Sequence, residues 1–91
     1  MEFAWDPIKS DAAYAARGFG FTVAASIFAG RVIEVEDTRH DYGEVRIQAI
    51  GQAATGQVLA VIYTDRGSVR RIISARIASK RERTEWLRQS A

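Results

Sequence analysis

The sequence predicts a single α+β domain over residues 1–91, with elements in the order β-α-α-β-β-β-β-α. Three observations support this fold class. Two segments with a helical period come first, and four segments rich in β-branched residues then follow one another with short polar connections. A helix-start motif lies near the C-terminus. With 91 residues and 47% apolar side chains, the chain can bury one modest hydrophobic core.

Two helices are expected near the N-terminus. Asp6 and Pro7 are typical of a helix start, because Asp accepts hydrogen bonds from free N–H groups and Pro fits the first turn. The first helix is therefore predicted for residues 7–17, with Gly18 following its end. The apolar spacing predicts a second helix over residues 22–29.

An antiparallel meander is expected next, because consecutive strands joined by short loops usually pair with their neighbours. The predicted strands, with a short extended piece at the N-terminus, are residues 3–5, 31–36, 44–49, 58–63 and 69–76. Val45, Ile47 and Ala49 alternate with polar residues, so this apolar set is expected to face the core. The run at 58–63 is continuously apolar, as in a central strand.

A third helix is expected to start at Ser79, because Ser79-Lys80-Arg81-Glu82 matches a capping box. Its apolar content is small, mainly Trp86 and Leu87. Such a helix is held to the sheet, or to a partner protein, by a few side chains. Trp86 is the residue on which these two alternatives depend, and packing on the sheet is the favoured interpretation.

The composition excludes several classes of protein. Cysteine is absent, which rules out disulfide scaffolds, zinc fingers and thiol catalysis, and one histidine is too few for a transition-metal site. No cofactor or metal is therefore expected. No apolar run approaches the ~20 residues of a membrane span, and the N-terminus lacks the pattern of a signal peptide. A cytoplasmic protein without membrane contact is the expectation.

The charge is distributed unevenly along the chain. The net charge is only +2, yet residues 1–45 hold four basic and eight acidic side chains, whereas residues 46–91 hold nine basic and three acidic ones. Eleven of the thirteen basic residues are arginines, which bind phosphate in a bidentate way. An anionic partner, with nucleic acid first, is one interpretation. An ordinary solvated charged surface is the other.

A series of short motifs occurs in a fixed order along the chain. The motifs are Phe3-x-Trp5-Asp6-Pro7-x-Lys9, His40, Gly43-Glu44-x-Arg46, Ile50-Gly51, Tyr63-Thr64-x-Arg66-Gly67, Arg71-Ile72-Ile73-Ser74-Ala75-Arg76-x-Ala78 and Arg81-Glu82. In this order and spacing they resemble the BrnT family of bacterial type II toxins, within the RelE/ParE-like superfamily. The resemblance spans nearly the whole chain, and the segment 71–76 is its most specific part.

The resemblance implies a RelE/ParE-like fold with a curved antiparallel sheet and metal-independent RNA cleavage that inhibits translation. It also implies a BrnA-type antitoxin with a DNA-binding domain, so that operator DNA is reached only through the antitoxin. The first helix departs from the family pattern, because Ala13, Ala16 and Arg17 stand where Asn and Lys-His are common. One alternative is therefore a catalytically weakened binding module that acts as a corepressor on operator DNA with its antitoxin. Another is a gyrase-directed toxin of the same superfamily.

RNA self-cleavage requires a base for the 2′-hydroxyl, cations for the charged phosphorane and an acid for the leaving oxygen. His40 is a candidate acid or base, since its ordinary pKa lies near neutrality; otherwise it is a surface histidine paired with Asp41. Glu44 and Arg46 would share one strand face opposite the core. They are candidate catalytic residues, or an ordinary surface ion pair.

Four further arginines are candidates for RNA contact. On the last strand, Arg70, Ile72, Ser74 and Arg76 are expected on the open face, and Val69, Arg71, Ile73 and Ala75 on the core face. Arg76 is the first choice for the catalytic, phosphate-binding cation, and Arg66 at a turn is the second. Arg71 would have to reach solvent or form a partly buried ion pair. Arg81 on the last helix either contacts RNA or is solvated.

Overall fold

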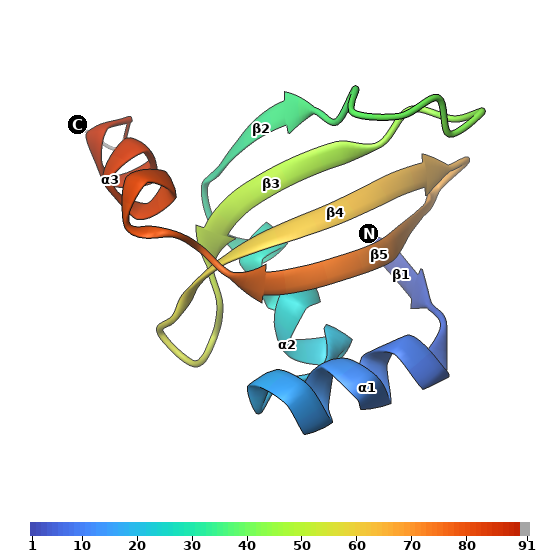
Figure 1. The fold of residues 1–91 in the computed structure, drawn as a ribbon, viewed down its shortest axis with the longest axis horizontal. Coiled ribbons are helices and arrows are strands. Elements are labelled where there is room, and N and C mark those ends of the chain that lie inside the picture. The colour runs from blue at the N-terminus through green and yellow to red at the C-terminus, as the bar shows by residue number, and fades with distance from the viewer. Residues whose placement is uncertain (90–91) are drawn as a thin grey trace.

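The computed structural model describes residues 1–89, so the last two residues of the predicted domain, 90 and 91, lie outside the described part. The elements along the chain are β1 (Glu2–Trp5), α1 (Pro7–Arg17), α2 (Phe21–Ala25), the 3-10 helix η1 (Ser26–Ala29), β2 (Val32–Glu36), β3 (Ile47–Gln52), β4 (Val58–Arg66), β5 (Val69–Ile77) and α3 (Lys80–Arg88) (Figure 1). Their order is the predicted one.

The five strands form one curved sheet in the spatial order β1-β5-β4-β3-β2. Strands β2 to β5 pair antiparallel with their sequence neighbours, which confirms the predicted meander. The N-terminal strand β1 pairs in parallel with β5. It therefore forms one edge of the sheet, and β2 forms the other. The apolar strand β4 lies at the centre, as its sequence predicts.

Helix α1 has the predicted bounds. The carboxylate of Asp6 accepts a hydrogen bond of 2.9 Å from the backbone N–H of Ile8. Gly18 adopts the left-handed conformation (φ 82°), and its N–H donates to the carbonyl of Tyr14. Among residues 1–89 no single helix is long and apolar enough to cross a membrane. Helix α1 and the segment Phe21–Ala29, bent by 95°, meet that test of length and composition only as a pair.

The second predicted helix is divided into α2 and η1. Ser26 lies at the junction, where its hydroxyl donates to the carbonyl of Val23 at 2.5 Å and accepts from the N–H of Ala54 at 2.8 Å. Both bonds fix the chain at the point where the α-helix gives way to the tighter 3-10 turn. The bond from Ala54 also ties this turn to the connection between β3 and β4.

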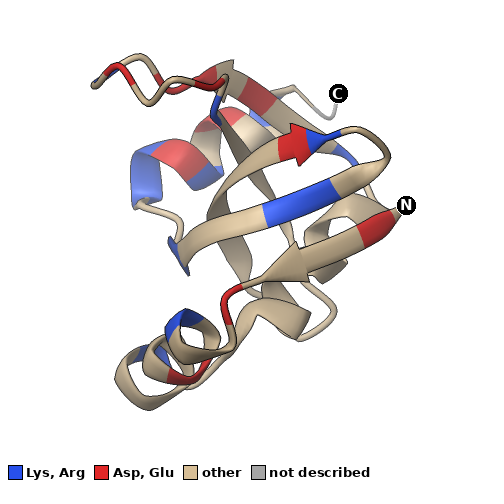
Figure 2. Ribbon diagram, turned by 90° about the vertical axis from the view of Figure 1, so that its right-hand side faces the viewer, with Lys and Arg blue, Asp and Glu red and all other residues tan. Residues whose placement is uncertain are grey.

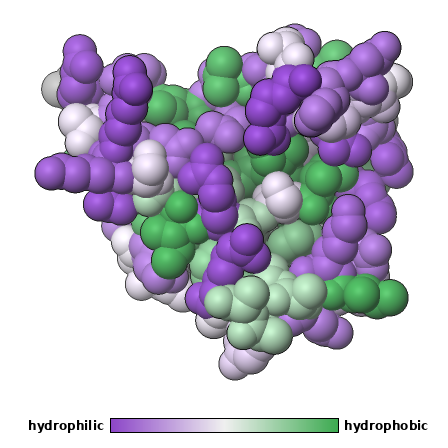
Figure 3. Space-filling view, viewed as in Figure 1, coloured by the Kyte–Doolittle hydropathy of each residue, from purple (hydrophilic) through white to green (hydrophobic). Residues whose placement is uncertain are grey.

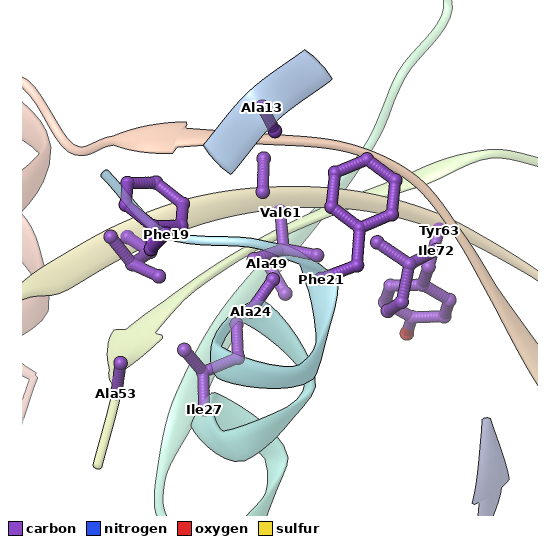
Figure 4. Close-up of a cluster of buried hydrophobic side chains, with 12 residues drawn as sticks. Ala13, Phe19, Phe21, Ala24, Ile27, Ala49, Ala53, Val61, Tyr63 and Ile72 are labelled. Atoms are coloured by element: carbon purple, nitrogen blue, oxygen red, sulfur yellow. The ribbon is translucent and has the colours of Figure 1, made fainter. Parts of the chain in front are cut away.

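The main hydrophobic core lies between the sheet and the N-terminal helices. Phe21, Ala24 and Ile27 project from α2 and η1 onto the sheet (Figure 4). The strands contribute Ala49, Leu59, Val61, Tyr63, Ile72 and Ala75. Ile27, Leu59 and Val61 have no exposed surface at all, so most of the hydrophobic stabilisation comes from this side of the sheet.

Helix α3 packs on the other face of the sheet through a smaller cluster around Ile50, Ala60 and Ala78. The predicted capping box is present, with Ser79 as N-cap residue. Trp86 packs against this cluster, and its indole N–H donates to the carbonyl of Arg31 at 3.0 Å. The Arg31 guanidinium lies 4.4 Å from the centre of the indole ring. The favoured interpretation, that Trp86 anchors the helix to the sheet, is confirmed.

A β-bulge in β5 changes which residues face the core. Tyr63 pairs with Ile72, but Ile62 pairs with Ser74, so that Ile73 is the extra residue. Directly paired residues point to the same face of a sheet. Before the bulge Ile72 therefore faces the helices with Tyr63 and is 1% exposed, and after the bulge Ala75 faces them.

The predicted faces of the last strand are consequently wrong before the bulge and right after it. Arg70 lies on the helix side, where its guanidinium is 3.9 Å from the centre of the Tyr63 ring and pairs with Asp65 at 2.8 Å. Arg71 lies on the open face, the same face as Arg76. The partly buried, paired arginine expected at position 71 is thus found at position 70.

Candidate active site

The face of the sheet opposite α1 and α2 is covered by α3 only at one end. In the view of Figure 1, which looks onto this open face, apolar and weakly polar residues occupy the centre within a hydrophilic rim (Figure 3). A pocket of about 160 Å³ lies on it. Its lining residues are Arg17, Arg39, Gln48, Ala60, Ile62, Ser74, Ala75 and Arg76. Among residues 1–89, three arginines and no carboxylate line this pocket, which makes it the strongest candidate for an anion site.

Arg76 is held in place from the end of β5. Its guanidinium donates to both carboxylate oxygens of Glu82, at 2.7 and 2.8 Å, and to the carbonyl of Ile77 at 3.4 Å. The described contacts thus use three of its five N–H donors. The side chain remains 47% exposed. The geometry is that of a preorganised cation, which can accept a phosphate without first being ordered.

The ion pair between Arg76 and Glu82 shifts the pKa values of both residues in the expected directions. The hydrogen bonds from Arg76 lower the pKa of Glu82 to about 2, with a smaller contribution from the backbone N–H of Ser79. The carboxylate of Glu82 in turn raises the pKa of Arg76. Gln48 also donates to Glu82, at 3.3 Å. Glu82 therefore joins the N-terminus of α3, the end of β5 and the start of β3 at the side of the pocket.

Arg39 reaches the pocket from the loop between β2 and β3. Asp37 holds it with two hydrogen bonds, 2.8 Å to Nε and 2.9 Å to one terminal nitrogen. The hydroxyl of Tyr42 also donates to Asp37, at 3.1 Å. These hydrogen bonds, of which those from Arg39 have the largest effect, hold the pKa of Asp37 well below its ordinary value. The Asp37 side chain is 4% exposed and that of Arg39 72% exposed, so a buried carboxylate orients an accessible cation.

Arg17 contributes the third guanidinium from the last turn of α1. A cation is favourable there, because the C-terminal end of a helix carries a partial negative charge. Sequence analysis noted Arg17 only as a departure from the family pattern and missed Arg39. The available signals were the last-turn position of Arg17 and the Asp37-x-Arg39 spacing, which lets a carboxylate bind a side chain two residues later.

Glu44 and Arg46 were predicted on a strand, but β3 begins only at Ile47. A backbone hydrogen bond from the N–H of Asp37 to the carbonyl of Arg46 lies just beyond the end of β2 and just before the start of β3. Glu44 precedes this bond and belongs to the loop. Val45 is 59% exposed, so its predicted core position is also wrong. Its carbonyl accepts a hydrogen bond of 2.8 Å from the hydroxyl of Thr64, which fixes the loop to β4.

Glu44, Arg46 and Arg66 form a second charged cluster. Glu44 lies 3.5 Å from the guanidinium of Arg46 and 3.3 Å from that of Arg66. The Arg46 guanidinium stacks over the Tyr42 ring, 4.1 Å from its centre. None of these three charged residues lines the pocket around Arg76. The structure thus brings three of the seven predicted site residues together, in a cluster separate from Arg76.

His40 lies in the same loop, next to Arg39, and is exposed. Its ring packs edge-on against Tyr42, with ring centres 5.6 Å apart. Asp41, the partner in the alternative interpretation, instead accepts a hydrogen bond of 3.1 Å from the N–H of Gly43. His40 therefore contacts Tyr42, whose hydroxyl donates to Asp37, the carboxylate that orients Arg39.

Arg71 and Arg81 lie further from the pocket lining. The basic positions in β5 form a broad band between β1 and β4 (Figure 2). From this band, Arg71 faces the open side and Arg70 the helix side. Arg81 is exposed on α3 and lines a different groove, between that helix and strands β2 and β3. Among residues 1–89, no group of three or more His, Cys, Asp or Glu side chains is placed to hold a metal ion.

Comparisons with known proteins identify the family. The model of a family described as the ribonuclease toxin BrnT of type II toxin–antitoxin systems matches residues 5–82. The chain belongs to this BrnT family. Among solved structures, it is similar to the Brucella abortus ribonuclease toxin BrnT, whose crystal structure was determined at 1.1 Å resolution. The two are 29% identical with a TM-score of 0.63, over 88% of this chain and 99% of that chain. None of the curated proteins matches.

Membership of the BrnT family makes the chain a ribonuclease toxin of a type II toxin–antitoxin system, so an antitoxin is its partner. The resemblance inferred from the short motifs is confirmed. The α+β fold class is confirmed as well, since the sheet and helices match those of the Brucella toxin. The roles of individual site residues stay predictions.

Proposed function

We propose that the toxin cleaves RNA without a metal ion, with the scissile phosphate bound in the pocket formed by Arg17, Arg39 and Arg76. The observation that carries the proposal is that, in the described part of the chain, three guanidinium side chains and no carboxylate line this pocket. In such a mechanism the 2′-hydroxyl attacks the adjacent phosphate and forms a 2′,3′-cyclic phosphate, while the 5′-oxygen leaves with a proton. The negative charge that builds on the phosphorane is stabilised by the arginines.

Each arginine has a distinct role in this proposal. Arg76, fixed by Glu82, binds a non-bridging oxygen of the scissile phosphate. Arg39, accessible and oriented by Asp37, follows the charge as it develops. Arg17 contacts the phosphate from the far side of the pocket. His40 follows Arg39 in the loop and is the candidate that donates a proton to the leaving oxygen or removes one from the 2′-hydroxyl.

The second cluster binds the substrate further along its backbone. Arg46 and Arg66 share the carboxylate of Glu44, which keeps their guanidinium groups in place. Arg71 continues the basic surface along β5. Phosphate contacts of this kind position a nucleic acid without reading its sequence. Glu44 thus acts in substrate binding through its two arginines, and Arg81 contributes a more distant charge on α3.

The antitoxin is proposed to be of the BrnA type, with a DNA-binding domain that carries the complex to its operator. An acidic segment of it would cover the arginine pocket, because the substrate bound there is itself anionic. We place the toxin in the cytoplasm, where the RNA that supports translation is found, and we treat residues 1–91 as one toxin domain.

The decisive experiment is RNA cleavage by the purified toxin in excess EDTA, with analysis of the product ends. We expect full activity in the chelator and 2′,3′-cyclic phosphate ends. Activity that is lost in EDTA and restored by a divalent ion contradicts the metal-independent mechanism. Growth arrest without RNA cleavage, accompanied by a DNA damage response, indicates a gyrase-directed toxin instead. Operator binding with the antitoxin, without growth arrest or cleavage, indicates a corepressor.

A further inference from the structure

The outer edge of β2 is an open edge of the sheet. β2 pairs with β3 on one side, and no strand in residues 1–89 pairs with it on the other. Figure 1 shows this edge running along the top of the molecule, away from α1 and α2. Open edges invite pairing with another chain.

The hydrogen bond between β2 and β3 at the loop determines which backbone groups point outward. The N–H of Asp37 donates to the carbonyl of Arg46 at 2.7 Å, in continuation of the register of the two strands. In an antiparallel pair, residues that exchange hydrogen bonds alternate with residues that do not. Val32, Glu34 and Glu36 therefore direct their N–H and C=O groups away from β3, toward the open edge.

The two faces of this edge differ in character. Glu34 lies on the helix face, where its carboxylate accepts a hydrogen bond from the hydroxyl of Tyr63, and Glu36 follows on the same face. Ile33 and Val35 point to the opposite face, beside a groove of about 460 Å³ between the sheet and α3. Val35 is 62% exposed there. The edge thus offers carboxylates on one face and an apolar surface on the other.

A second copy of the chain is a poor partner for this edge. Antiparallel self-pairing centred on Glu34, Val35 or Glu36 places carboxylates directly opposite one another in every case, and like charges in that position are unfavourable. The segment from Val32 to Asp37 has three carboxylates and no basic residue. Acidic positions follow one another from β2 into the next loop (Figure 2). The same charges favour a partner strand that carries Lys or Arg.

We propose that a basic, extended segment of the antitoxin adds to the outer edge of β2 as a sixth strand. Its Lys or Arg side chains lie opposite Glu34 and Glu36, and its alternate apolar side chains cover Ile33 and Val35 at the groove beside α3. Backbone hydrogen bonds to Val32, Glu34 and Glu36 provide the affinity, and the alternation of charge provides the specificity. The proposal rests on the antitoxin that a type II toxin has, and not on the cleavage mechanism.

Amide hydrogen exchange of the toxin, alone and bound to its cognate antitoxin, tests the proposal. In the free toxin the outward N–H groups of Glu34 and Glu36 should exchange faster than the inward ones of Ile33 and Val35. Antitoxin binding should slow the outward groups by at least about tenfold. Unchanged exchange at Glu34 and Glu36 in a fully formed complex overturns the proposal. Protection that rises with the concentration of free toxin also overturns it, because it indicates self-pairing.

Substitutions at Glu36 separate two contributions to antitoxin binding: the backbone hydrogen bond and the charge of the side chain. Glu36→Pro removes one outward N–H without touching the β2–β3 ladder, and Glu36→Lys reverses the charge. Each should weaken antitoxin binding by roughly tenfold. Glu36→Ala, the matched control, keeps the N–H and should weaken binding by about threefold or less. Equal affinities for all three variants, with unchanged melting temperatures, overturn the proposal. RNA cleavage by the free toxin should be the same in all three variants and the parent. Because antitoxin binding is measured separately, the binding results test this proposal even if the proposed cleavage mechanism is wrong.

Discussion

Arg76 and Glu82 are joined by two parallel hydrogen bonds, of 2.7 and 2.8 Å, across the junction between β5 and α3. One pair of side chains thereby fixes a cation at the proposed cleavage site and attaches the C-terminal helix to the sheet. Substitutions of the two partners should separate these roles, since only Arg76 is proposed to contact the substrate.

Arg76→Ala should reduce RNA cleavage by about a hundredfold or more, because it removes a preorganised charge from the transition state. Arg76→Lys should restore activity only in part, since a lysine keeps the charge but not the planar fork. Cleavage rates of the purified variants give the measurement. Glu82→Gln is the matched control: it retains a capping-box residue and the cation but weakens the support of that cation, so the loss should be clearly smaller than for Arg76→Ala, about tenfold or less. Equal losses for Arg76→Ala and Glu82→Gln would mean that Arg76 acts only by holding α3.

The free energy of unfolding should fall at acid pH, because the ion pair between Arg76 and Glu82 is lost there. The pKa of Glu82 is about 2 in the folded protein, below its ordinary value of 4.5. A carboxylate with a lowered folded pKa stabilises the protein above its unfolded pKa, and this contribution is lost as the pH falls toward the folded value. Melting temperatures measured from pH 6 to pH 2 should therefore drop between about pH 5 and pH 2. Glu82→Gln should flatten part of this drop. Identical profiles for the variant and the parent would exclude Glu82 as a source.

Asp37→Asn should lower RNA cleavage by on the order of tenfold to a hundredfold, because it replaces one of the two acceptor oxygens that aim Arg39 at the pocket and removes their negative charge. The effect should appear mainly in kcat, since Arg39 keeps its charge and still attracts RNA. Asp41→Asn in the same loop is the matched control, because Asp41 is exposed and accepts a hydrogen bond from the N–H of Gly43 rather than from Arg39. If the two variants cleave equally well, Arg39 does not depend on Asp37 for catalysis.

Two adjacent isoleucines in β5 test the position of the bulge. Ile72 is 1% exposed within the main core, whereas Ile73 is only partly buried. Ile72→Ala should cost about 2–5 kcal/mol of unfolding free energy by leaving a cavity, and Ile73→Ala should cost clearly less. Chemical denaturation of both variants measures the difference. The reverse order of stability would show that the strand runs without a bulge and that Ile73 faces the core.

Local patterns in the sequence predicted those parts of the fold that depend on neighbouring residues. The bounds of α1 follow from Asp6 and Gly18, and the start of α3 follows from the capping box at Ser79. The faces of β5 could not be predicted before Ile73, because a bulge depends on how two strands pair and leaves no mark on the alternation of one strand. The start of β3 was missed for a related reason, since Val45 alternates correctly but has no pairing partner in β2.

The candidate site was harder to predict than the fold. Arg76 was selected because it was predicted to end a strand on the open face of the sheet, and it lies next to the last residue of β5. Arg17 and Arg39 come from a helix end and a loop that are distant from Arg76 in the sequence, and only tertiary structure brings the three into one pocket. Glu44 and Arg46 were selected from strand alternation, and they form a separate cluster because the chain leaves the ladder before Ile47.

The bulge at Ile73 also separates β5 into two halves whose side-chain facings are set independently. Loss of that one residue would restore a regular ladder without turning either half over, because Tyr63 would still pair with Ile72 and Ile62 with Ser74. A relative lacking a residue here therefore keeps the same order of polar and apolar residues on both sides of the gap. In sequence alignments of such toxins, a one-residue gap at Ile73 and an alternation that runs unbroken through this strand should occur together.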